Sequence, residues 1–378
     1  MTLSIPTSLA PMEALLVADL PRGPEWQYEP KWDGFRCLAF RDGATIELRS
    51  KSGKPLNRYL PEIVAALRQV KTERFALDGE LIVPVADSLS FDQLLQRIHP
   101  AASRVEKLSQ AYPALFIVFD LLAGNGGESL LSDPLAGRRA ALEHFVAQRV
   151  PPGSPLRLSP QTQAFSDIQR WFGSFGSGLD GIIAKRRDLP YQSANRHGMQ
   201  KYKRMRTADC VVGGFRYAAK EPLVGSLLLG LYDEAGLLNH VGFAANIKTD
   251  ERPALTRKLE SLIKTPGFTG RAPGGPSRWS TERSGEWKPL APKLVAEVQY
   301  DHFSGERFRH GTRFLRWRPD KAPRQCVIGQ VAQEAASTLA LLDDAVSRAP
   351  PGSASHRRSS KKPARKASRP VSTATRKR

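Results

Sequence analysis

The chain has 378 residues, of which 40% are hydrophobic, and a formal net charge of +20. This length exceeds the usual size of one hydrophobic core and favours two domains. The sequence has no apolar run long enough to span a membrane, no signal-peptide pattern, and only three, widely spaced cysteines. These features exclude a membrane-spanning protein, a disulfide framework and a zinc ribbon, and we expect a cytoplasmic protein.

Residues 1–204 show the pattern of a first domain that mixes strands and helices. Four apolar runs predict strands, at residues 35–40, 45–49, 75–83 and 115–122. The turn dipeptide Asp42–Gly43 joins the first two runs and predicts a hairpin. Asp133 as N-cap and Pro134 in the first turn predict the start of one helix, and Ser166 predicts the start of another.

From residue 208 onward, short strands separated by glycine-containing turns replace this pattern. The strand candidates are residues 210–215, 227–232, 238–243 and 294–300. Such a series of short strands predicts a small β-barrel, which we assign to residues 205–345. Residues 264–287 are rich in Pro, Gly and Ser and predict a long loop.

The last part of the chain, residues 346–378, contains eleven Lys or Arg and no acidic residue. It has almost nothing to bury, so we expect a disordered basic tail. The rest of the chain keeps 46 basic and 37 acidic residues. Both parts are therefore basic, which favours a polyanionic partner, although charge alone fits RNA or a membrane surface as well as DNA.

A single lysine, Lys31, lies in the aromatic and acidic segment Glu29–Arg36, directly before a predicted strand. For a lysine with the ordinary pKa, deprotonation to the neutral, nucleophilic amine costs about 4.6 kcal/mol at pH 7. Nucleophilic lysines reduce this cost through burial or nearby cations. A K-x-D-G sequence by itself is more often a surface turn, so the interpretation of Lys31 depends on the rest of the chain.

Further short segments complete a pattern around Lys31. They are Arg49–Gly53, Leu77–Leu81, Phe119–Leu122, Asp180–Lys185, Lys201–Lys203 and Arg318–Lys321. Together with the Lys31 segment, they resemble in sequence and order the signature motifs of the covalent nucleotidyltransferases. This superfamily comprises ATP-dependent DNA ligases, RNA ligases and mRNA capping enzymes. The resemblance implies an enzyme that attaches AMP covalently to Lys31.

The resemblance also implies the roles of other residues. Glu29 recognises adenine, Phe119 stacks on it, Arg49 meets phosphate or ribose, and Glu80 binds ribose. The complete set implied for ATP is Glu29, Lys31, Arg36, Arg49, Glu80, Phe119, Lys185, Lys201, Lys203, Arg318 and Lys321. Glu80 and Asp180 are the candidate ligands for Mg²⁺, with Mn²⁺ as an alternative. Asp180 replaces the glutamate usual at its position and is one methylene shorter.

The residue types agree with this chemistry. The chain has no P-loop, so lysines and arginines must supply the positive charge that glycine-loop amides provide elsewhere. Lys201 and Lys203 alternate along a predicted strand, which places both ammonium groups on one face. Two such charges suit an α-phosphate whose negative charge grows during transfer. The seven histidines show no zinc-binding spacing, and we interpret His99 and His302 as structural or surface residues.

The strongest resemblance is to stand-alone C-type bacterial ATP-dependent DNA ligases. It rests on residues 28–36, 96–100, 206–212 and 225–232. It implies an α+β fold: an ATP-grasp-like nucleotidyltransferase domain of mainly antiparallel sheets over residues 1–204, then an OB-fold barrel. The implied partners are ATP and nicked duplex DNA, with a monomeric, nucleoid-associated enzyme acting in DNA repair, recombination or replication.

Two alternatives remain open at this point. An RNA ligase or capping enzyme would share the motif set, although capping uses GTP and Glu29 favours adenine. A non-catalytic, chromatin-like DNA-binding protein would fit the composition and the tail, but it would leave the motifs around Lys31 without a purpose.

Overall fold

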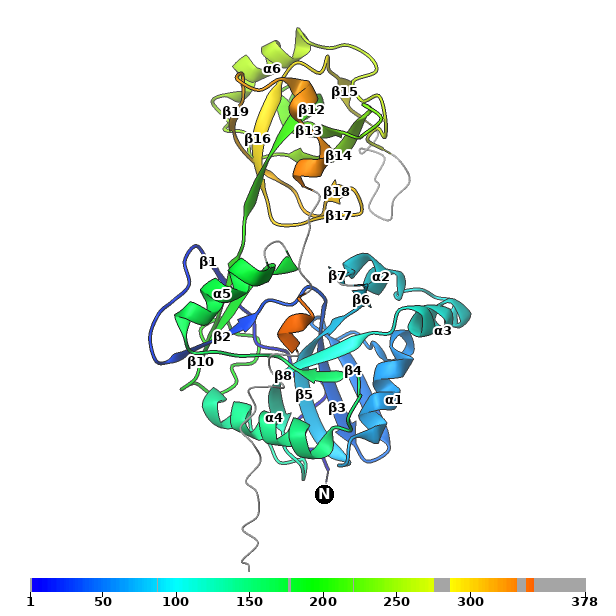
Figure 1. Cartoon of the computed structure of the whole chain (residues 1–378), viewed down its shortest axis with the longest axis vertical. Coiled ribbons are helices and arrows are strands. Elements are labelled where there is room, and N and C mark those ends of the chain that lie inside the picture. The colour runs from blue at the N-terminus through cyan, green and yellow to red at the C-terminus, as the bar shows by residue number, and fades with distance from the viewer. Residues whose placement is uncertain are drawn as a thin grey trace, which may run out of the picture.

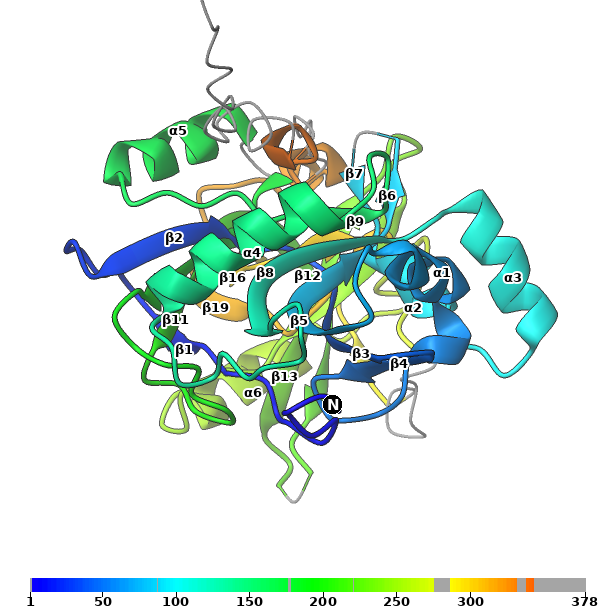
Figure 2. The ribbon, with the colours of Figure 1, turned by 90° about the horizontal axis from the view of Figure 1, so that it is seen from below.

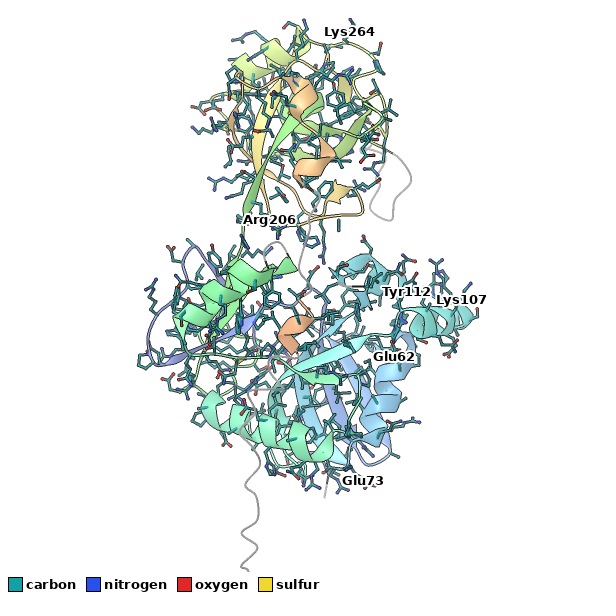
Figure 3. All side chains as sticks on the ribbon, in the orientation of Figure 1. Glu62, Glu73, Lys107, Tyr112, Arg206 and Lys264 are labelled. Carbon is teal, nitrogen blue, oxygen red and sulfur yellow. The ribbon has the colours of Figure 1, made fainter. Side chains whose placement is uncertain are left out.

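The computed structural model describes residues 2–86, 88–175, 178–219, 221–274, 286–331 and 338–342. These residues form two lobes, and the beginning of strand β12 joins them (Figure 1). Arg206, the first residue of β12, lies at the junction between the lobes (Figure 3). The predicted basic tail and the middle of the predicted loop at residues 264–287 lie outside the described residues.

A five-stranded sheet forms the centre of the first lobe. Its strand order is β4-β3-β5-β8-β9, and only the β8–β9 pair is parallel. The strands are β3 (Phe35–Asp42), β4 (Thr45–Ser50), β5 (Arg74–Ile82), β8 (Leu115–Ala123) and β9 (Leu156–Leu158). The predicted hairpin is confirmed, because Asp42 pairs with Thr45 and Gly43 adopts a positive φ of 62°.

Helices cover the outer face of this sheet. Their apolar residues, such as Ile63 and Phe145, pack with Leu77 and Val118 of the strands in one core. Figure 2 shows α4 (Leu135–Arg149) lying across β8. The other helices here are α1 (Pro61–Gln69), α2 (Phe91–Gln96) and α3 (Ala102–Ala111), and a small hairpin of β6 (Pro84–Val85) and β7 (Ser88–Leu89) precedes α2.

The capping expected for α4 is wrong in detail. Pro134 occupies the N-cap position, and no side chain caps the helix. Asp133 is therefore not the cap, because a proline there fixes the backbone before the helix without offering a side-chain acceptor.

A second sheet of the first lobe has the order β1-β11-β10-β2. Its strands are β1 (Leu15–Val17), β2 (Trp26–Pro30), β10 (Gly181–Arg186) and β11 (Met199–Lys203). On one face, Tyr28 and Ile182 pack against Ile168 and Trp171 of α5 (Phe165–Phe175), which begins one residue before the predicted Ser166. The other face carries polar side chains together with Ile183 and Met199, which pack in a cluster with Leu38.

The second lobe is an antiparallel sheet with the order β14-β13-β12-β16-β19. The elements are β12 (Arg206–Tyr217), β13 (Val224–Tyr232), β14 (Leu238–Ala244), α6 (Arg252–Glu260), β15 (Lys288–Pro289), β16 (Val295–Tyr300), β17 (Phe303–Ser304), β18 (Arg307–Phe308) and β19 (Arg313–Trp317). An isolated bridge between Ala244 and Thr312 brings the two edges of the sheet together. This is the partly open barrel typical of an OB fold.

Residues 338–342 return to the first lobe, although the sequence analysis assigns residues 205–345 to the second domain. Figure 1 shows this short segment, in orange, beside β8 and below α5. Leu341 is fully buried, and together with Leu342 it packs in the same core as Trp26 and Trp171. No sequence pattern predicted this return, because three leucines near a polar tail fit either lobe.

Within the described ranges, every helix is too short or too polar to cross a membrane.

Candidate active site

The predicted site residues meet where the two sheets of the first lobe face each other. In the β1-β11-β10-β2 sheet, Glu29 pairs with Ile183, which pairs in turn with Lys201. Paired residues share a face, and residues two apart along a strand do so as well. The polar face therefore collects Glu29, Lys185, Lys201 and Lys203, as the alternation in the sequence predicted.

Two glycines allow the backbone around Lys31 to close tightly. The Lys31 amide donates a hydrogen bond of 3.0 Å to the Gly181 carbonyl. A Cβ on Gly181 would lie 2.0 Å from the Tyr202 carbonyl oxygen, and one on Gly34 would lie 2.0 Å from that of Leu81. Because backbone atoms fill that space, only glycine fits at either position. This explains the glycine that follows Asp33 and the one that follows Asp180.

Acidic groups surround the Lys31 side chain. Its Nζ lies 3.2 Å from the Asp180 carboxylate, and the side chain is 20% exposed. Burial acts to lower the pKa of Lys31, but the carboxylates of Asp180, Asp33 and Glu80 outweigh it, so the pKa is raised. The expectation of a lowered pKa is therefore not met in the free protein, because anions and not cations are the nearest charges.

Charged side chains enclose an aromatic ring beyond Lys31. Lys185 binds the buried Glu29 at 2.8 Å and lies 4.1 Å from the centre of the Phe119 ring. The Arg36 guanidinium lies 4.5 Å from the same ring. Burial lowers the pKa of Lys185, although Glu29 opposes this effect. This group combines a flat apolar ring with a fixed carboxylate, two features that can recognise a planar base with amino groups.

Arg36 and Glu80 occupy neighbouring positions on β3 and β5. Arg36 donates two hydrogen bonds of 2.6 Å to Asp78, which also accepts one of 2.7 Å from the Tyr191 hydroxyl. Asp78 thus fixes Arg36. Burial raises the pKa of Glu80 to about 7, against the opposing charges of Arg36 and Lys31. Glu80 can therefore act as a hydrogen-bond donor or acceptor near neutral pH.

Lys201 and Lys203 complete the basic side of the site. Burial lowers the pKa of Lys201, and the neighbouring charges of Lys203, Lys51 and Lys31 lower it further. Lys203 binds Asp301 of the second lobe at 2.7 Å. An anionic group therefore already lies against one of the two lysines expected to bind phosphate.

Sequence reasoning missed three residues of this site. His302 Nδ1 lies 3.3 Å from Asp180, and Arg309 forms an ion pair with Asp33. Asp33, Asp180 and His302 each offer a ligand atom, and these atoms lie within 4.8 Å of one another. The sequence analysis interprets His302 as a structural or surface residue, and the structure places its ring against Asp180, beside Lys31. No local pattern could have predicted the contact between His302 and Asp180, because His302 belongs to the other lobe and is 122 residues from Asp180.

Three predicted residues lie away from this group. Arg49 binds Glu47 and the carbonyl of Gly53 on the first lobe. Arg318 and Lys321 bind Asp209 within the second lobe, at 3.0 and 2.7 Å. Among the contacts between described residues, none joins Arg318 or Lys321 to the first lobe.

A large groove of about 1920 Å³ lies next to the site. Phe91, Asp92 and Leu95 of the first lobe line one side of it. The second lobe contributes several basic side chains: Arg216, Arg252, Arg271, Lys288, Arg307 and Arg309. A basic groove of this kind matches the charge pattern of surfaces that bind a nucleic-acid backbone.

Comparison with known proteins agrees with this architecture. Residues 11–203 match the ATP dependent DNA ligase domain, and residues 220–321 match the ATP dependent DNA ligase C terminal region. These two matches cover most of the chain. The chain therefore belongs to the ATP-dependent DNA ligase family.

Individual relatives narrow the assignment. The chain is 43% identical to DNA ligase C2 of Mycolicibacterium smegmatis over 88% of its own length and 96% of that protein. It is 41% identical to DNA ligase C of Mycobacterium tuberculosis over 91% of its own length and 98% of that protein. These similarities define a stand-alone bacterial ligase of the C type. Like its family, it uses ATP to seal nicks in duplex DNA through an enzyme–AMP adduct and 5′-adenylylated DNA, in DNA repair.

A solved structure supports the fold. The structure of a Lig E DNA ligase aligns with a TM-score of 0.52 over 82% of this chain and 99% of its own, at 16% identity.

Proposed function

We propose that Lys31 is the residue that carries AMP in this ligase. The observation that supports this most directly is the setting of Lys31, which lies against Asp180, within the field of Asp33 and Glu80, and near Lys201. Glu29 and Phe119 would hold adenine, and Lys201 and Lys203 would hold the α-phosphate. The first lobe alone would thus contain the nucleotide pocket.

Other residues would act on the rest of the nucleotide. Arg36 and Glu80 lie beside the base-binding wall and would meet the ribose, and Arg49 would meet ribose or phosphate from β4. Arg318 and Lys321 would bind the terminal phosphates after the second lobe turns toward the first. The hinge for that movement would lie between β11 and β12, where the chain passes from the first lobe to the second, in keeping with domains divided near residues 204 and 205.

The donors around Asp180 suit a divalent cation such as Mg²⁺ or Mn²⁺. Asp180 supplies carboxylate oxygens beside the expected phosphates, and Glu80 is a second candidate ligand. A bound cation would offset the carboxylate charges that raise the pKa of Lys31 and would polarise the α-phosphate. Lys31 would then lose its proton more easily.

The reaction consists of three transfers. The Lys31 amine attacks the α-phosphorus of ATP, and the bond to pyrophosphate breaks. An oxygen of the 5′-phosphate at a nick then attacks the same phosphorus, and the bond to Lys31 breaks with its electron pair returning to the amine. Finally the 3′-hydroxyl attacks the activated 5′-phosphate, and AMP leaves with the electron pair.

The basic groove between the lobes would hold the nicked duplex close to Lys31. Residues of both lobes line the groove, so we infer that a monomer suffices to hold the duplex. We expect this enzyme at the nucleoid in the cytoplasm, because DNA is its substrate.

The direct test is covalent labelling with α-labelled ATP, followed by denaturing electrophoresis across a magnesium titration. The unaltered protein should form an adduct only with metal, and Lys31→Ala should form none while unfolding at the same denaturant concentration. Lys107→Ala, an exposed lysine on α3, is the matched control and should label fully. Labelling of the Lys31→Ala protein would refute the assignment.

A further inference from the structure

Two consecutive residues of the second lobe reach into the nucleotide site of the first. Asp301 and His302 lie between β16 and β17. The Asp301 carboxylate lies 2.7 Å from Lys203 Nζ, and His302 Nδ1 lies 3.3 Å from Asp180. Both partners belong to the first lobe and to motifs expected to bind the α-phosphate and the metal. We call Asp301 and His302 the lobe contact.

The two side chains of the lobe contact are largely shielded from solvent. The Asp301 side chain is 20% exposed, and His310 also binds it, at 3.0 Å. One side chain from each lobe therefore holds the Asp301 carboxylate in place.

This contact competes with the first transfer in two ways. The Asp301 carboxylate occupies the side of Lys203 that a phosphate needs, and like charges at one ammonium repel each other. In addition, Arg318 and Lys321 bind Asp209 within their own lobe, so the second lobe must turn before they can reach ATP. Turning the lobe breaks the contacts of Asp301 and His302.

We propose that the lobe contact is an autoinhibitory latch, which holds the second lobe away from the orientation needed for adenylation until the nucleotide phosphates displace Asp301. This inference rests on the proposed function of Lys31 and Lys203. If only a fraction of the molecules has the latch open, the apparent affinity for ATP equals the intrinsic affinity multiplied by that fraction. Removing the negative charge should therefore raise adenylation and leave its chemistry intact.

The test compares Asp301→Asn with a matched control four residues earlier in the chain. Glu297→Gln removes a carboxylate of β16 whose partner, Arg316, lies in the same lobe, so the lobe contact stays intact. Single-turnover adenylation is measured at limiting ATP, at low and moderate salt. We expect Asp301→Asn to react roughly fivefold faster than the unaltered protein at low salt, the scale of one exposed or half-buried ion pair. Salt should reduce the difference between the two adenylation rates. It screens the Asp301–Lys203 charge pair of the unaltered protein, whereas Asp301→Asn has no such pair.

A second measurement follows the lobes without any chemistry. The three native cysteines are buried, so Lys107→Cys and Lys264→Cys can carry a fluorescent donor and acceptor. These exposed positions lie on opposite lobes (Figure 3). Without nucleotide, Asp301→Asn should shift the energy-transfer distribution toward the one that α,β-methylene-ATP produces in the labelled parent, and Glu297→Gln should not.

The outcomes separate the latch from the proposed function. Faster adenylation together with the shifted distribution supports the latch. Unchanged or slower adenylation by a folded Asp301→Asn protein, or an unchanged distribution, overturns it. A parent protein that forms no adduct at all would instead refute the role of Lys31, and the energy-transfer measurement would still decide on the latch.

Discussion

His240 shows how strongly the surroundings of one side chain can change its protonation. It lies on β14, is 9% exposed, and its Nε2 atom is buried without a hydrogen-bond partner. Burial lowers its pKa to about 3, and the charges of Arg307, Arg216 and Arg271 add to this effect. His240 is therefore neutral in the folded protein at any pH where the protein is used, whereas an unfolded chain would protonate it below about pH 6.5.

This difference predicts a loss of stability in acid. Between about pH 6.5 and pH 3 the unfolded state binds one more proton at His240 than the folded state, so the free energy of unfolding falls as pH falls. From pH 7 to pH 5 we expect His240→Gln to lose about 2 kcal/mol less of its unfolding free energy than the unaltered protein. Urea denaturation at both pH values measures this.

The exposed His197 provides the control, because it has no comparable burial. His197→Gln should follow the unaltered protein at both pH values. If His240→Gln loses as much unfolding free energy from pH 7 to pH 5 as the unaltered protein, the neutral state of His240 contributes nothing to the pH dependence.

The segment of residues 338–342 changes how the lobes are connected. Because Leu341 and Leu342 pack beside Trp26 and Trp171, the chain crosses from one lobe to the other twice. The first crossing is the β11–β12 junction, and the second leads back to residues 338–342. A movement of the second lobe must therefore be compatible with both crossings.

We expect Leu341→Ala to reduce the stability of the first lobe by about 2–5 kcal/mol, the usual cost of such a truncation at a fully buried leucine. Urea denaturation monitored by tryptophan fluorescence suits this test, since Trp26 and Trp171 are in the same core. Leu237→Ala is the control, because Leu237 is 42% exposed and should change stability little. Equal midpoints for the two variants would show that the segment does not dock in solution.

For the whole molecule, the separation of Arg318 and Lys321 from Lys31 predicts that they serve one step of the reaction. Arg318→Ala or Lys321→Ala should slow formation of the lysine–AMP adduct more than sealing of DNA that already carries AMP at its 5′ end. The reason is that these cations would touch the ATP phosphates only after the second lobe has turned. The two rates are measured separately with ATP and with pre-adenylylated nicked DNA, and equal losses in both would contradict this division.

The basic tail predicts an additional, salt-dependent attachment to DNA. Each phosphate that a cation neutralises steepens the logarithmic salt dependence of binding by nearly one unit. A chain ending at Val346 lacks all eleven basic residues of positions 346–378, because the first of them is Arg348. It should bind nicked duplex more weakly at low salt, with a shallower slope and unchanged adenylation of Lys31. Superimposable salt curves for the full and shortened chains would leave the tail without a role in binding.

Local sequence predicted much of this protein. The hairpin of β3 and β4, the strands β5, β8, β13 and β14, and the shared face of Lys201 and Lys203 follow from short-range alternation and turn chemistry. Neighbouring residues determine these features, so they can be predicted without the fold. Helix α6 was missed, because its polar sequence has little apolar periodicity. The ordered motifs around Lys31 identified the family, which the comparisons confirm.

Only the tertiary structure decided which charges meet. Asp180 faces both Lys31 and His302, and Lys203 binds Asp301, across 98 residues or more of the chain. The raised pKa of Lys31 and the position of Arg318 on Asp209 likewise depend on how sheets and lobes are placed. A local pattern determines which face of a strand a residue occupies. It does not determine what lies opposite that face, because packing between distant segments sets those distances and with them the electrostatics of the site.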